Sequence, residues 1–118
     1  MAKKVLIIDD DPIIIKYLTT LFHDNGYETL VANDGLEGMT VLKSEKPDLI
    51  TLDLEMPEEW GPRFYRKMAK ESELKDIPVI VISGLSGSQY SIKKAVATIK
   101  KPFDKEELLK IVKQTIGE

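Results

Sequence analysis

The fold is indicated by the stretch Lys4-Val5-Leu6-Ile7-Ile8-Asp9-Asp10-Asp11-Pro12, in which an apolar run meets three acidic residues and a proline. Residues 4–8 are rich in branched apolar side chains and do not alternate with polar ones, which is typical of a strand covered on both faces. Asp11 can cap a helix, and Pro12 suits a first helical position. The stretch therefore predicts a buried strand that leads directly into a helix.

The same pattern continues along the chain. Apolar runs at 49–52 and 79–82 predict two more buried strands, and weaker signals favour strands at 28–32 and 98–100. Helical patterns lie at 12–25, 35–44, 62–71 and from the Asp104 cap onward. The first helix should bury Ile14, Leu18, Leu21 and Phe22, and the last Leu108, Ile111, Val112 and Ile116. This alternation predicts an α/β fold, a doubly wound five-stranded parallel sheet.

The composition limits the class of protein. The chain has 118 residues, which suits one domain over 1–118, and no cysteine, which excludes disulfides and fits a reducing compartment. Seventeen basic and twenty acidic residues give a net charge of -3, so the protein has no overall positive electrostatic potential that would attract nucleic acid. No apolar run approaches a membrane span or a signal peptide. We expect a cytoplasmic protein that binds neither nucleic acid nor membrane.

Polar residues follow the predicted strands. Asp9 and Asp10 close the first, Asp53 the third and Ser83 the fourth, and Lys101 follows the last. The carboxyl ends of parallel strands form the edge where such sheets bind ligands. Clustered carboxylates repel one another unless a cation neutralises them, and their oxygens suit Mg²⁺. Lys101 and Ser83 could then hold phosphoryl oxygens, with Asp53 as nucleophile.

Three stretches, Val5-Leu6-Ile7-Ile8-Asp9-Asp10-Asp11-Pro12, Pro47-Asp48-Leu49-Ile50-Thr51-Leu52-Asp53-Leu54-Glu55-Met56-Pro57 and Lys101-Pro102-Phe103, strongly resemble the signatures of response-regulator receiver domains. The resemblance covers nearly the whole chain. It implies a flavodoxin-like sheet with strand order 2-1-3-4-5, like that of chemotaxis regulators. It also implies a cis peptide bond before Pro102.

The resemblance assigns roles to particular residues. Asp53 would be the phosphoacceptor, Asp10 a direct Mg²⁺ ligand, Asp9 a ligand through water, and Glu55 a ligand through its backbone carbonyl. Ser83 would be the switch hydroxyl and Lys101 the phosphoryl contact. The implied function is a stand-alone signalling switch of a two-component system, which catalyses only its own phosphorylation and dephosphorylation. Its partners would be a sensor histidine kinase or phosphotransfer protein and a downstream protein, and it would be a monomer or weak dimer.

Two features depart from the family pattern. Thr98 stands where most relatives have an aromatic residue that follows the switch hydroxyl. The interval from Ser83 to Lys101 is short, and Gly84-Leu85-Ser86-Gly87-Ser88 is a poor helix former, so the fourth helix should be shortened or irregular. We therefore expect the two-state element to be the segment 84–91, with Tyr90 supplying the aromatic contact.

Other functions remain alternatives at this point. An aspartyl-nucleophile phosphohydrolase would share the acidic cluster, but the chain shows no cap domain to enclose a substrate. A flavin-binding module would need a phosphate loop after the first strand, where acids stand instead, and a partner-binding pseudo-receiver would lack site residues. His23 is expected on the solvated surface. Trp60 either anchors a partner or packs over its own loop.

Overall fold

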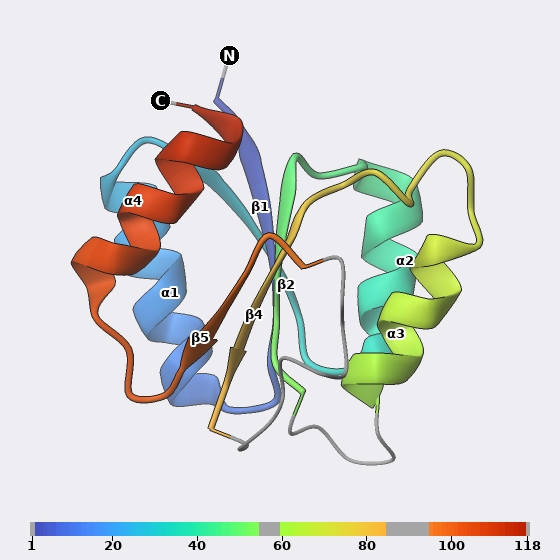
Figure 1. Ribbon diagram of the computed structural model, residues 1–118, viewed down its shortest axis with the longest axis horizontal. Coiled ribbons are helices and arrows are strands. Elements are labelled where there is room, and N and C mark those ends of the chain that lie inside the picture. The colour runs from blue at the N-terminus through green and yellow to red at the C-terminus, as the bar shows by residue number, and fades with distance from the viewer. Residues whose placement is uncertain (1, 55–59, 85–94, 118) are drawn as a thin grey trace.

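The computed structural model describes residues 2–54, 60–84 and 95–117. Its centre is a five-stranded parallel sheet in the order β2-β1-β3-β4-β5 (Figure 1), as expected. The strands are β1 (Lys4–Ile8), β2 (Glu28–Ala32), β3 (Leu49–Leu52), β4 (Val79–Ser83) and β5 (Ala97–Lys100). The helices are α1 (Pro12–Asp24), α2 (Gly35–Glu45), α3 (Trp60–Ala69) and α4 (Lys105–Ile116).

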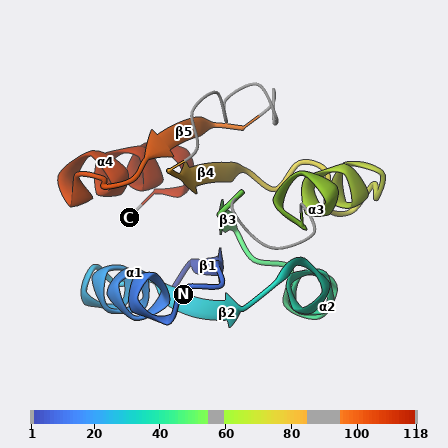
Figure 2. The same ribbon diagram turned by 90° about the horizontal axis from the view of Figure 1, so that it is seen from below.

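Helices cover the sheet on both faces. Figure 2 shows α1 and α4 on one face and α2 and α3 on the other. Within β1, Leu6 and Ile8 belong to the apolar cluster under α2 and α3, whereas Val5 and Ile7 belong to the cluster under α1 and α4. All four side chains are at most 1% exposed. This two-sided burial explains why the central strands are continuously apolar.

The predicted helix caps are present. Asp11 Oδ1 accepts a hydrogen bond from the Ile13 backbone N–H at 2.9 Å, and Asp104 Oδ1 accepts one from the Glu106 N–H at 2.9 Å. After α1, Gly26 adopts a φ of 90°, a left-handed conformation that favours glycine. The predicted inward residues of α1 and α4 all pack into the same apolar cluster.

Several boundaries differ from the sequence prediction. Helix α3 begins at Trp60 rather than at residue 62, because a proline within the first helical turn removes no intrahelical hydrogen bond. It ends at Ala69 in a tightened turn in which the Lys70 and Glu71 N–H groups bond to carbonyls three residues back. Helix α2 extends one residue further than predicted, and Lys46 ends it with a φ of 46°.

Some sequence predictions fall outside the described residues. The shortened fourth helix and most of the expected switch segment lie within 85–94, and Glu55 lies within 55–59. The Trp60 side chain is likewise not described. Among the helices of the described ranges, none combines the length and apolar character needed to cross a membrane.

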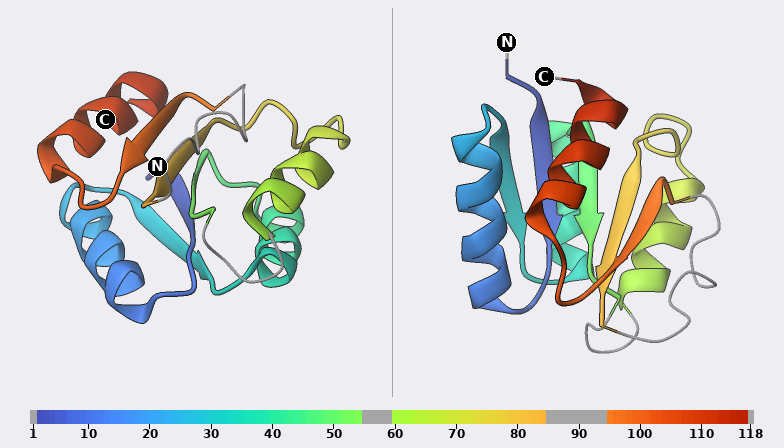
Figure 3. Two further views of the ribbon diagram at one scale, coloured as in Figure 1. Left: turned by 60° about the horizontal axis from the view of Figure 1, so that its bottom comes forward. Right: turned by 60° about the vertical axis from the view of Figure 1, so that its left-hand side comes forward.

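Both chain ends lie at the end of the molecule away from the carboxyl ends of the strands (Figure 3). The Glu28 N–H donates to the Lys3 carbonyl at 2.8 Å. The hydroxyl of the neighbouring Tyr27 donates to the Gly117 carbonyl at 3.0 Å. Segments near both ends of the chain are therefore hydrogen-bonded to Tyr27 and Glu28, at the start of β2.

Candidate functional site

Backbone hydrogen bonds just past the strands bring the predicted site residues together. The Asp53 N–H donates to the Ile8 carbonyl at 3.0 Å, which places Asp53 beside the end of β1. The Lys101 N–H donates to the Ser83 carbonyl at 3.0 Å, which places the start of the last loop beside the end of β4. Parallel pairing thus continues one residue beyond the strands and aligns their polar endings at one edge.

Three carboxylates form a cluster at this edge. Asp9, Asp10 and Asp53 each offer an oxygen, and these oxygens all lie within 4.8 Å of one another. Asp9 and Asp53 are buried, at 2% and 3% exposed, whereas Asp10 is exposed. A hard divalent cation prefers such oxygen ligands, and a partly open site lets it retain water. The arrangement therefore fits Mg²⁺.

The Lys101 ammonium group lies within the acidic cluster. Its Nζ is 3.3 Å from Asp9 Oδ2 and 3.7 Å from Asp53 Oδ1. Of these two contacts of Lys101, the one with Asp9 is the shorter. Lys101 thus supplies the positive charge that partly balances the two buried carboxylates.

Asp9 is electrostatically unusual. Burial raises its pKa above the ordinary value of 3.8, and the neighbouring charge of Asp10 adds to the rise. A hydrogen bond from the Asp11 N–H, 2.9 Å long, and the charge of Lys101 lower the pKa but do not cancel the effect of burial. The ionised form of Asp9 is therefore incompletely compensated, and a further cation would stabilise it.

The remaining predicted residues are placed as follows. Ser83 ends β4 and is fully buried, and its backbone pairs with the residue before Lys101. The peptide bond between Lys101 and Pro102 is cis, as the resemblance implied. The His23 side chain is 80% exposed, in agreement with the prediction of a solvated position. Thr98 lies exposed on β5, the edge strand.

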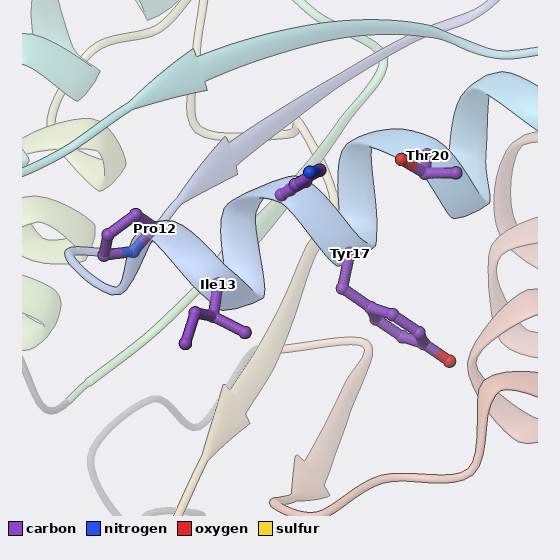
Figure 4. Close-up of a pocket in the computed structure, with 5 residues that line it drawn as sticks. Pro12, Ile13, Tyr17 and Thr20 are labelled. Atoms are coloured by element: carbon purple, nitrogen blue, oxygen red, sulfur yellow. The ribbon is translucent and has the colours of Figure 1, made fainter.

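A groove beside the acidic cluster was not anticipated from the sequence. It has a volume of about 290 Å³ and is lined by Ile13, Ile14, Tyr17, Lys101, Pro102 and Phe103. The Tyr17 and Phe103 rings meet across it, with centroids 5.7 Å apart. A second hollow follows α1 past Lys16 and Thr20 (Figure 4). The sequence did contain a signal for this surface. Ile13 and Tyr17 are four residues apart and lie outside the buried stripe of the first helix, so they form an apolar pair on its outer side.

Comparison with known proteins identifies the family. The sequence model of one protein family, the response regulator receiver domain, matches residues 5–113. The chain belongs to this family. It is 34% identical over 117 residues to protein Rrf1 of Nitratidesulfovibrio vulgaris, covering 99% of this chain and 85% of that one. The Vibrio cholerae chemotaxis protein CheY4 superposes with a TM-score of 0.90 at 28% identity, covering 98% and 99% of the two chains.

A third structure shares the fold. The receiver domain of the sensor histidine kinase PA1611 from Pseudomonas aeruginosa has a TM-score of 0.89 at 20% identity and covers the whole of both chains. That receiver was crystallised with a magnesium ion coordinated in its active-site cleft. Receiver domains are signalling proteins of two-component systems rather than true enzymes, and this chain is a receiver domain.

Proposed function

We propose that this receiver domain is a switch in which Asp53 accepts a phosphoryl group from a sensor histidine kinase or a phosphotransfer protein. The observation that carries the proposal is the convergence of three carboxylates and the Lys101 ammonium group at one sheet edge. The phosphorylated form would signal by contact with a downstream protein. We place this activity in the cytoplasm, without nucleic acid, in a monomer or weak dimer.

Asp9, Asp10 and Asp53 would hold Mg²⁺, with Asp10 bound directly, Asp9 through water, and the Glu55 backbone carbonyl as a further ligand. When bound, Mg²⁺ would neutralise the carboxylates and allow an anionic phosphoryl donor to approach. The raised pKa of Asp9 and the mutual closeness of the carboxylate oxygens support this assignment. The magnesium ion in the PA1611 receiver, which shares the fold, adds support.

The chain's own residues would perform the transfer as follows. A carboxylate oxygen of Asp53 attacks the phosphorus, the bond from phosphorus to the donor breaks, and the donor leaves with the electron pair. Lys101 then turns from Asp9 toward the new phosphoryl oxygens, a short movement because its Nζ already lies 3.7 Å from Asp53. The Ser83 hydroxyl supplies a second contact to these oxygens.

The phosphoryl group would stay on the protein until water removes it, so the chain would catalyse only its own modification. An aspartyl-nucleophile phosphohydrolase would instead turn over free phosphomonoesters with the same cluster. A turnover assay with p-nitrophenyl phosphate separates the two functions. The phosphohydrolase should release many equivalents of product, whereas any release by the switch should slow after one equivalent to the rate at which its aspartyl phosphate is hydrolysed.

The proposal is tested by mass spectrometry after incubation with acetyl phosphate and Mg²⁺. Wild-type protein should gain one phosphoryl group that hydroxylamine removes, because an acyl phosphate is labile to this reagent. Asp53→Asn should gain none, and Asp24→Asn, which changes an exposed aspartate at the end of α1, should behave as wild type. Phosphorylation of the Asp53→Asn protein would refute the assignment.

A further inference from the structure

We propose that Tyr17 is a positioning residue for phosphoryl transfer, whose ring acts through Phe103 to hold the Lys101 ammonium group in place. This inference rests on the proposed function, because it concerns the cation that serves Asp53. The observation behind it is the ring contact between α1 and the loop that carries Lys101.

The contact joins an exposed residue to a partly buried one. The Tyr17 and Phe103 ring planes meet at 60°, and their centroids are 5.7 Å apart, a favourable tilted geometry. Phe103 packs against the apolar cluster under α1 and α4, whereas Tyr17 is 43% exposed. Figure 4 shows the Tyr17 ring leaving α1 toward the connection between β5 and α4. Tyr17 thus covers the outer side of Phe103.

Phe103 is linked to Lys101 by a short stretch of restricted backbone. Only Pro102 separates them, and its ring restricts the φ angle. At one end of this stretch the Lys101 N–H bonds to the Ser83 carbonyl at 3.0 Å. At the other end, the Phe103 ring is held between the core and Tyr17. A shift of the Phe103 ring would therefore change the direction in which the Lys101 side chain leaves the backbone.

The site is sensitive to such a change. Lys101 Nζ lies 3.3 Å from Asp9 and 3.7 Å from Asp53, so a displacement of about 1 Å would remove one contact or both. Tyr17 and Lys101 also line the same groove, together with Pro102 and Phe103, so the residues of the proposed route border one space. Because Tyr17 is half exposed, its loss should alter this geometry more than it alters the stability of the core.

The test measures the rate of Asp53 phosphorylation by acetyl phosphate and Mg²⁺, which needs no protein partner. Tyr17→Ala should slow the reaction roughly two- to tenfold, the factor that corresponds to loss of one aromatic pair. Tyr17→Phe should keep the wild-type rate, because the ring contact does not require the hydroxyl. Tyr65→Ala is the control, since it removes a tyrosine ring that is partly buried against the cluster on the opposite face.

A double-mutant cycle shows whether Tyr17 acts through Lys101. In a Lys101→Ala background, Tyr17→Ala should cause no further loss of rate. An equal loss in both backgrounds, a wild-type rate in Tyr17→Ala, or the same loss in Tyr65→Ala would overturn the role of Tyr17 while leaving phosphorylation of Asp53 intact. A wild-type protein that is not modified on Asp53 would overturn the proposed function and the role of Tyr17 with it.

Discussion

The Lys101 ammonium group lies 3.3 Å from Asp9 Oδ2, closer to this carboxylate than to Asp53. Asp9 has no other cationic partner among the described residues. The Lys101 ammonium group therefore already neutralises part of the carboxylate charge that a bound metal cation would neutralise. Binding of Mg²⁺ and the present position of Lys101 should oppose each other.

The first prediction follows from this opposition. Lys101→Ala should bind Mg²⁺ more tightly, by about 1 kcal/mol or roughly fivefold, because the repulsion between ammonium and metal is removed. Isothermal titration calorimetry with MgCl₂ measures the change, and Lys100→Ala, an exposed neighbour, is the matched control. An unchanged or weaker affinity would show that Lys101 does not compete with the cation.

The second prediction concerns Asp10, the exposed member of the cluster. Asp10→Ala should abolish phosphorylation by acetyl phosphate and weaken Mg²⁺ binding, while the protein remains folded, because Asp10 is exposed and no hydrogen bond within the described residues requires it. Phosphorylation is followed by mass spectrometry and folding by circular dichroism. A folded variant that is phosphorylated at the wild-type rate would remove Asp10 from the metal site.

The third prediction uses the raised pKa of Asp9. The folded protein holds the Asp9 proton more tightly than the unfolded chain, in which the ordinary pKa is 3.8. The resulting contribution to stability is present below pH 3.8 and is lost as the pH rises through the raised folded pKa. Without metal, Asp9→Asn should therefore increase the free energy of unfolding near neutral pH, and this gain should fade on acidification.

Urea unfolding in EDTA across this pH range measures the effect. Asp24→Asn, on the exposed end of α1, controls for the loss of one negative charge. Added Mg²⁺ should stabilise the wild type and reduce the advantage of the Asn variant. A gain from Asp9→Asn that is largest at acidic pH would contradict the direction of the pKa shift.

The fourth prediction concerns the packing of α2 on the sheet. A Cβ atom on Gly38 would lie 2.9 Å from Ile8 Cδ1 and 3.2 Å from Phe64 Cε1, and both side chains are buried. Gly38→Ala should lower the free energy of unfolding by about 1 kcal/mol, because overpacking outweighs the gain in helix propensity. Thr40→Ala, exposed on the same helix, isolates the propensity gain and should be neutral or stabilising.

The sequence predicted that the candidate site residues lie together, because their positions are defined by where strands end. Asp9, Asp53 and Ser83 each follow an apolar run, and parallel pairing brings the ends of such runs to one edge. The bounds of β1 and β3 were likewise predicted correctly, since both strands are buried on both faces and are continuously apolar. These properties depend on short segments and can therefore be read from the amino-acid sequence alone.

Properties that depend on which surfaces meet were not predictable in this way. The preference of Lys101 for Asp9 over Asp53 depends on differences of tenths of an ångström between side chains 92 and 48 residues apart in sequence. The contact of Tyr17 with Phe103 depends on how α1 packs beside the last loop. The role expected for 84–91 stays a prediction, which hydrogen exchange with and without beryllofluoride would test.

The anchoring of both chain ends at the start of β2 has a practical consequence. Because the bonds to Lys3 and Gly117 lie at the end of the molecule opposite the acidic cluster, a tether attached at either end leaves that cluster facing solution. Protein captured on a biosensor surface by an N-terminal or C-terminal tag would thus present Asp53 in the same orientation. Kinases and targets could be screened against one uniformly oriented layer.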